Sequence, residues 1–132
     1  LERIGDHAEN IVEYTRTIIE DNLKFSEQAM SEMRDICDKC RNLMELSFAM
    51  FNAQGASPEM IERIIQAEDS VDECKDNFKM SHIVRMNDGV CNAVSGAMFL
   101  NMLIDIERIG DHSINVAFAI PNRNKQVVTR TA

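Results

Sequence analysis

The chain carries nearly the same sequence at two places that are far apart. Residues 1–12 read LERIGDHAENIV, residues 106–117 read IERIGDHSINVA, and the shared letters ERIGDH recur 105 positions apart. Self-similarity at a fixed distance is typical of proteins built from repeated structural units. We therefore expect a longer protein with a repeated three-helix unit. This chain would hold one complete unit and the last helix of the unit before it.

Apolar residues recur at spacings of three and four along four segments, which is the pattern of amphipathic helices. The expected helices span about residues 1–24, 26–54, 57–87 and 92–120. Three of them follow an expected N-cap, a role typical of Ser and Asn, namely Ser26, Ser57 and Asn92. Residues 122–132 follow Pro121, lack this periodicity and are expected to form a flexible tail.

Long helices joined by short connections have to run antiparallel to their neighbours. The expected helices are roughly 25–32 residues long, with connections of about 2–6 residues between them. The predicted fold class is therefore all-α, an antiparallel up-and-down four-helix bundle that forms one domain over residues 1–121.

The composition excludes several classes of protein. The chain has 132 residues, 14 basic and 22 acidic side chains and a formal net charge of -8, whereas binding to nucleic acid requires a basic face. It contains no run of 18 apolar residues, so we expect no membrane span. Because the sequence also lacks a glycine-rich phosphate loop and any Ser/His/Asp arrangement, we predict that it is not an enzyme.

The four cysteines are expected to be free core thiols in a reducing compartment. Cys37 and Cys40 have the spacing of half a zinc site, but they fall in the middle of a predicted helix, on its apolar side. A structural zinc site needs four ligands, and only the separate Cys74 and Cys91 remain.

Acidic residues follow the edge of the apolar stripe on three predicted helices. A spacing of four places them on one line along each helix. They are Glu68, Asp72 and Asp76 in the third helix, Glu107 and Asp111 in the fourth, and Glu2 and Asp6 in the first. Carboxylates gathered from facing helices repel each other strongly unless a cation lies between them. We therefore predict a carboxylate-lined site for a divalent cation, since hard and borderline metals prefer oxygen ligands.

A solvated acidic face without a ligand remains an alternative, because like charges at this spacing cost only about 0.2–0.5 kcal/mol on an exposed helix. A ferritin-like di-iron site needs Glu-x-x-His on two helices, which this sequence lacks. His7 and His112 each follow an Asp by one residue, about 100° around a helix. We expect them to point away from the acidic stripe and to have a surface or capping role.

The motif Glu107-Arg-Ile-Gly-Asp-His-x-x-Asn115, with Glu68-x-x-x-Asp72 upstream, resembles the PhoU family. The segment His82-Ile-Val-Arg-Met-Asn-Asp-Gly-Val-Cys91 looks most like the PhoU-like domain that follows the membrane part of bacterial sodium/phosphate cotransporters. The resemblance implies repeated three-helix units. It also implies that iron, zinc or another divalent cation can bind, with no cofactor required; the implied ligands are Glu68, Asp72, Glu107, Asp111, Glu2 and Asp6.

The function that this resemblance implies is a non-catalytic regulatory or accessory domain of a sodium-dependent phosphate transporter. The expected location is the cytoplasmic face of the inner membrane, and the expected partners are the membrane portion of the same transporter chain and a second copy in a homodimer. A free-standing PhoU-type regulator of phosphate uptake and signalling is the first alternative. A purely structural helical bundle with idle acidic stripes is the second.

Overall fold

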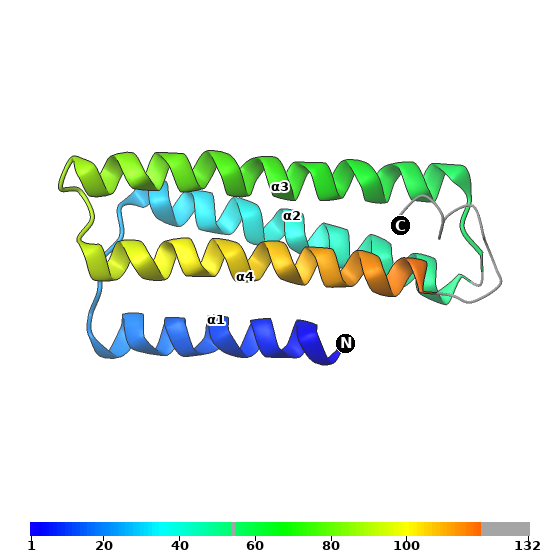
Figure 1. Ribbon diagram of the computed structural model, residues 1–132, viewed down its shortest axis with the longest axis horizontal. Helices are drawn as coiled ribbons and strands as arrows, with labels where there is room; N and C mark the ends of the chain where they lie inside the picture. The colour runs from blue at the N-terminus through cyan, green and yellow to red at the C-terminus, as the bar shows by residue number, and fades with distance from the viewer. Residues whose placement is uncertain (54, 120–132) are drawn as a thin grey trace.

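The computed structural model describes residues 1–53 and 55–119, so the expected tail at 122–132 lies outside the described residues. The helices are α1 (Glu2–Glu20), α2 (Glu27–Asn52), α3 (Pro58–Asn87) and α4 (Ala93–Phe118). They alternate in direction along the long axis of the molecule (Figure 1). No strand occurs in the described residues. The predicted all-α, up-and-down arrangement is confirmed.

The starts of three helices are held by the N-caps that the sequence predicts. The side-chain oxygens of these residues accept hydrogen bonds from backbone N–H groups in the first turn of each helix; the caps are Ser26, Ser57 and Asn92. A cap of this kind contributes about 1 kcal/mol, because it gives a partner to an N–H group that has none within the helix.

The first helix ends at Glu20 rather than at about residue 24. Asn22 has a positive φ of 52°, and the N–H of Leu23 donates to the carbonyl of Ile18. This is a Schellman ending, in which a left-handed residue stops the helix and gives partners to its last carbonyls. Gly89 ends α3 in the same way, with φ of 76°.

The four helices do not contact one another equally. Helices α2, α3 and α4 form a three-helix bundle in which each packs against the other two, whereas α1 packs mainly against α4. The most deeply buried side chains lie inside the three-helix bundle, among them Ile36, Leu43, Ile64, Val71 and Leu103. Within α1 only Ile4 is buried. Figure 1 shows α1 along the outer side of α4.

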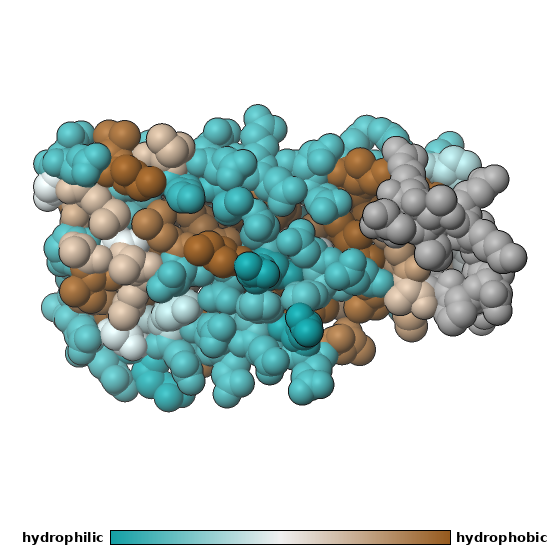
Figure 2. Space-filling model, viewed as in Figure 1, coloured by the Kyte–Doolittle hydropathy of each residue, from teal (hydrophilic) through white to brown (hydrophobic). Residues whose placement is uncertain are grey.

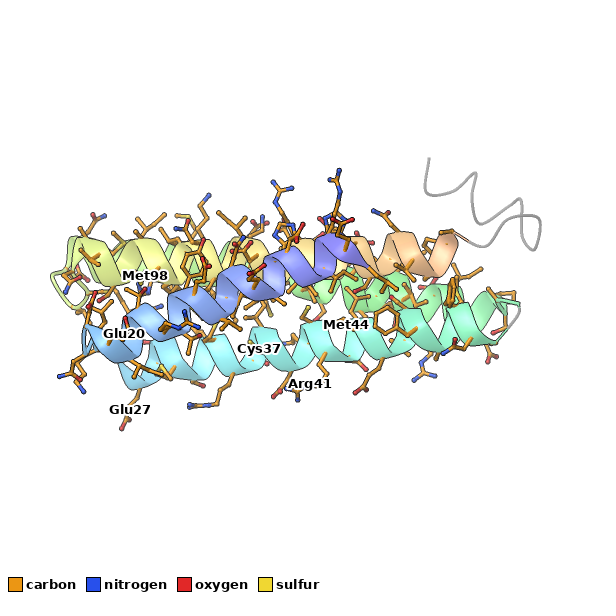
Figure 3. All side chains as sticks on the ribbon, turned by 90° about the horizontal axis from the view of Figure 1, so that it is seen from below. Glu20, Glu27, Cys37, Arg41, Met44 and Met98 are labelled. Carbon is orange, nitrogen blue, oxygen red and sulfur yellow. The ribbon has the colours of Figure 1, made fainter. Side chains whose placement is uncertain are left out.

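One end of the bundle exposes apolar side chains. Figure 3 shows Glu20 at the end of α1 and Glu27 at the start of α2 at this end, where the connection from α3 to α4 also lies (Figure 1). We call it the apolar end and define it by exposed residues at the end of α3, in the α3–α4 connection and at the starts of α2 and α4: Met30, Val84, Val90 and Val94. Brown apolar patches are visible at this end, on the left of Figure 2. A pocket of about 280 Å³ lies close by, lined by α1, the α1–α2 connection, α2 and α4; its lining includes Ile19, Phe25 and Met33.

Two further expectations concern the thiols and membrane insertion. All four cysteines are free, and Cys40 and Cys91 are buried. Burial raises the pKa of the Cys40 thiol to about 11, so that the thiolate needed by a zinc ion is disfavoured. Among the described helices, none combines the length and the apolar character that crossing a bilayer requires.

Candidate acidic site between α3 and α4

Four of the seven predicted acidic residues come together between α3 and α4. Glu68 and Asp72 on α3 and Glu107 and Asp111 on α4 are all half-buried. The two helices pack against each other in opposite directions, so their stripes face one another along the seam. We call these four residues the acidic cluster.

The charges of the acidic cluster repel one another. Burial raises the pKa of Glu68, and the charges of Asp72 and Asp111 raise it further. The pKa of Asp72 is raised by burial and then by Glu107 and Asp111. The pKa of Asp111 is also raised, by burial first and then by Glu107. The folded protein therefore disfavours full ionisation of the cluster, as expected for carboxylates in a region of reduced dielectric constant.

Lys75 on α3 provides positive charge beside the cluster. Its Nζ lies 2.7 Å from Oε2 of Glu107 and 3.1 Å from Oδ1 of Asp76. These hydrogen bonds raise the pKa of Lys75, and its charge opposes the upward pKa shifts of Asp72 and Asp111. Asp76 itself is 70% exposed and is bound to this lysine.

The two acids of α1 do not share this environment. Glu2 and Asp6 are exposed, although they occupy the positions equivalent to Glu107 and Asp111. The glycines between the acids show why. A Cβ added at Gly110 would lie 3.0 Å from Cδ2 of Leu43, while one at Gly5 would meet no atom of the described residues within 4 Å. The glycine side of the motif is packed against α2 and α3 in the α4 copy and has no such neighbours in the α1 copy.

The described residues do not form a ready-made metal site. Among them, no three or more His, Cys, Asp and Glu side chains are grouped as a ligand set. A divalent cation with oxygen ligands needs several donors at short distances from one point. The acidic cluster has the right donor atoms, but a lysine is bound to one of them. The present arrangement therefore does not fit a bound metal, and the cation site stays a prediction.

His7 has a partner in the core rather than a surface or capping role. Its Nδ1 lies 2.7 Å from Oδ1 of Asp105, a residue that is only 6% exposed. Asn10 donates a hydrogen bond to the same oxygen, and the ring of His7 stacks on that of His112 with centroids 5.4 Å apart. These contacts attach α1 to α4.

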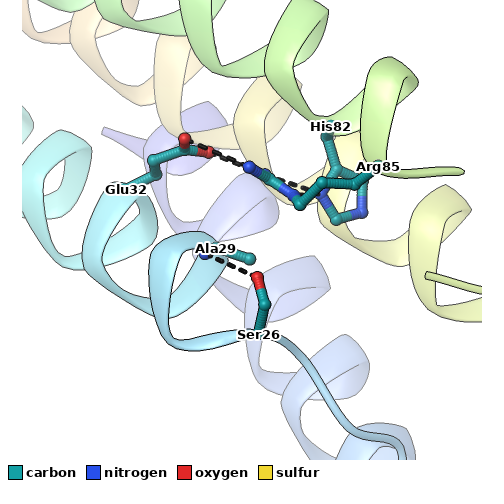
Figure 4. Close-up of polar contacts among 5 residues, drawn as sticks. All are labelled: Ser26, Ala29, Glu32, His82 and Arg85. Atoms are coloured by element: carbon teal, nitrogen blue, oxygen red, sulfur yellow. Dashed lines mark hydrogen bonds and ion pairs between the residues drawn. The ribbon is translucent and has the colours of Figure 1, made fainter. Parts of the chain in front are cut away.

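A second buried polar group escaped the sequence analysis (Figure 4). Arg85 on α3 forms two hydrogen bonds to the carboxylate of Glu32 on α2, of 2.7 and 3.2 Å. It also donates through Nε to Nδ1 of His82. Burial and the charge of Arg85 lower the pKa of His82 to about 4, with Glu32 acting in the opposite direction. The neutral imidazole stacks on Phe99 at 3.9 Å between ring centroids.

The signal for this network was present in the sequence. Glu32 lies at the spacing of Ala29 and Ile36, on the apolar face of its helix, where an acidic residue requires a partner. His82 and Arg85 are part of the segment that carries the resemblance to transporter-linked PhoU domains. In the structure these two side chains join the end of α3 to the start of α2.

Comparison with known proteins places the chain in a family. The PhoU domain pattern matches residues 33–120. The chain is 26% identical over 116 residues to a Thermotoga maritima protein named phosphate-specific transport system accessory protein PhoU homolog 1. The match covers 88% of this chain and 48% of the relative, so the chain spans about half the length of that protein. No solved structure matched. The chain belongs to the PhoU domain family.

Proposed function

We propose that this chain is a non-catalytic regulatory domain of a sodium-dependent phosphate transporter and acts at the cytoplasmic face of the membrane. The observation that carries the proposal is the PhoU domain match over residues 33–120, which includes the acidic cluster as well as His82 and Arg85 of the buried network. The relative from Thermotoga maritima is named as an accessory protein of phosphate transport. The segment from His82 to Cys91 favours a transporter-linked domain by its resemblance to such domains.

A free-standing regulator of phosphate uptake is the second candidate, and the family match supports it equally. The two candidates differ in the partner that the domain contacts. In the first, the partner is the membrane portion of the same chain; in the second, it is a separate transporter or signalling protein. A purely structural bundle would need no partner at all.

The apolar end is the surface that we propose to contact the membrane portion. Val90 is 60% exposed, Val94 is 56% exposed and Met30 is 44% exposed. Apolar side chains gathered on one surface are typical of contact sites between proteins. The three residues come from the α3–α4 connection and from the first turns of α4 and α2, so the surface depends on the folded bundle.

The experiment compares variants of the full-length protein in cells. Met30→Asp with Val94→Asp places two charges on the apolar end, while Ser31→Asp with Ala93→Asp places them on neighbouring exposed positions as a control. We expect the first pair to change how sodium-dependent uptake of radioactive phosphate responds to phosphate supply, and the control pair to behave as wild type. An unchanged response in both pairs would contradict the proposal. A changed phosphate-starvation reporter with unchanged sodium-dependent uptake would favour the free-standing regulator.

A further inference from the structure

Lys75 makes the direct connection between the acidic stripe of α3 and that of α4. Its ammonium group contacts Glu107 across the helix seam and Asp76 on its own helix. Only 24% of the lysine side chain and 22% of the Glu107 side chain are exposed. An ion pair with this degree of burial is less screened by solvent than a pair on the open surface.

The ammonium group and a divalent cation would compete for the same carboxylates. Both are attracted to the oxygens of the acidic cluster, and like charges at ion-pair distance repel each other strongly in a partly buried site. The effect of Lys75 reaches beyond its direct partners, since its charge also acts on Asp72 and Asp111. The side chain therefore neutralises part of the charge of both stripes.

We infer that Lys75 is the resident cation of the acidic cluster and takes the place of a divalent metal ion between α3 and α4. Two consequences follow. The helix pair needs no metal to hold its facing acids together, and the cluster gains affinity for a divalent cation when the lysine charge is removed. The inference concerns the chain itself and does not depend on its proposed role in phosphate uptake.

The test measures binding of Mn²⁺, an ion that accepts carboxylate ligands. Lys75→Met removes the charge and keeps an apolar stem of similar length. Lys79→Met makes the same change at an exposed lysine of α3, and Lys75→Arg keeps the charge in place. We expect Lys75→Met to bind Mn²⁺ at least about tenfold more tightly than the other three proteins, by titration calorimetry. The Tm of this variant should rise on addition of MnCl₂.

Equal Mn²⁺ binding by wild type and Lys75→Met, whether weak or tight, would overturn the inference. So would tighter binding by Lys79→Met than by Lys75→Met. If Lys75→Met is unfolded without metal, circular dichroism in the presence of MnCl₂ decides the question. Recovery of helix in MnCl₂ supports the inference, and failure to recover helix contradicts it.

Discussion

The imidazole ring of His7 stacks on the ring of His112, its equivalent 105 positions later in the repeated sequence. The two copies of the motif therefore meet each other across the contact between α1 and α4. In each copy, the glycine of the motif lies on a different side of the helix from this histidine contact. On α4 the glycine side is buried against α2 and α3 at Gly110, while on α1 the equivalent Gly5 is open among the described residues.

Substitution of the two equivalent glycines should give opposite effects on stability. Gly110→Leu forces a side chain against Leu43 and Val71, and overpacking of this kind costs about 1–3 kcal/mol. Gly5→Leu fills open space and replaces glycine within a helix, which favours folding by up to about 1 kcal/mol. Urea unfolding of both variants measures the difference. Similar losses of unfolding free energy in the two variants would contradict the open environment of Gly5.

Neutralising one member of the acidic cluster should stabilise the protein at neutral pH. The pKa of Asp111 is raised in the folded state, so the charged carboxylate opposes folding above that pKa. Asp111→Asn is expected to increase the free energy of unfolding at pH 7 by a few tenths of a kcal/mol. The gain should shrink as the pH falls, because the wild-type carboxyl group then becomes neutral as well.

Glu107→Gln is the matched control for that variant. It also removes one negative charge from the acidic cluster, but it weakens the contact with Lys75. We expect this variant to be less stable than Asp111→Asn in thermal unfolding at pH 7. The opposite order would mean that the lysine contact contributes nothing measurable.

Local chemistry explains which parts of the fold could be predicted. The caps at Ser26, Ser57 and Asn92 depend on a few neighbouring residues, and the apolar periodicity of each helix reports its buried face directly. The early end of α1 was missed because Asn22, unlike Gly, does not mark a left-handed position by its type alone. Periodicity also cannot say which helix covers a face, so the packing of α1 mainly on α4 did not follow from it.

At the acidic site, too, the spacing of residues along a helix does not say which other helix they face. Spacing places Glu68, Asp72, Glu107 and Asp111 on the edges of two helices, and helix packing brings these edges together. For Glu2, spacing gives the same prediction, but Glu2 is exposed in the structure. Lys75 lies three residues after Asp72. A positive charge at this spacing could have indicated from the sequence that a lysine lies beside the acidic cluster.

The buried ion pair should respond very differently to single and double substitution. Arg85→Met leaves Glu32 buried without its partner, which costs about 3–5 kcal/mol. Arg85→Met combined with Glu32→Leu removes both charges and should recover most of that loss. The exposed pair of Asp35 and Lys39 is the control, and its disruption should cost less than about 1 kcal/mol. Urea unfolding of the variants tests these differences, and a small loss in Arg85→Met would show that Glu32 is solvated.

Acidification should destabilise the protein through His82. Its pKa is lowered from 6.5 to about 4 in the folded state, so the unfolded chain takes up this proton first. The stability that the folded protein gains by keeping His82 neutral is fully present above pH 6.5 and is lost as the pH falls toward 4. The full loss in the free energy of unfolding is on the order of 3 kcal/mol. His82→Gln can still accept a hydrogen bond from Arg85 but does not titrate. The difference in unfolding free energy between wild type and this variant should therefore depend on pH within that window, and a constant difference would contradict the assignment.

The exposed apolar residues of α1 lead us to expect that the chain forms a homodimer in solution. Val12 is 56% exposed and Ile19 is 73% exposed, and both line a groove of about 410 Å³ on α1. Val12→Lys with Ile19→Lys should give a monomer in sedimentation velocity, because two charges would have to be desolvated on association. Glu9→Gln with Glu13→Gln changes the net charge by the same amount without touching apolar residues, so this control should remain dimeric. A wild-type chain that sediments as a monomer at all concentrations would rule out this dimer.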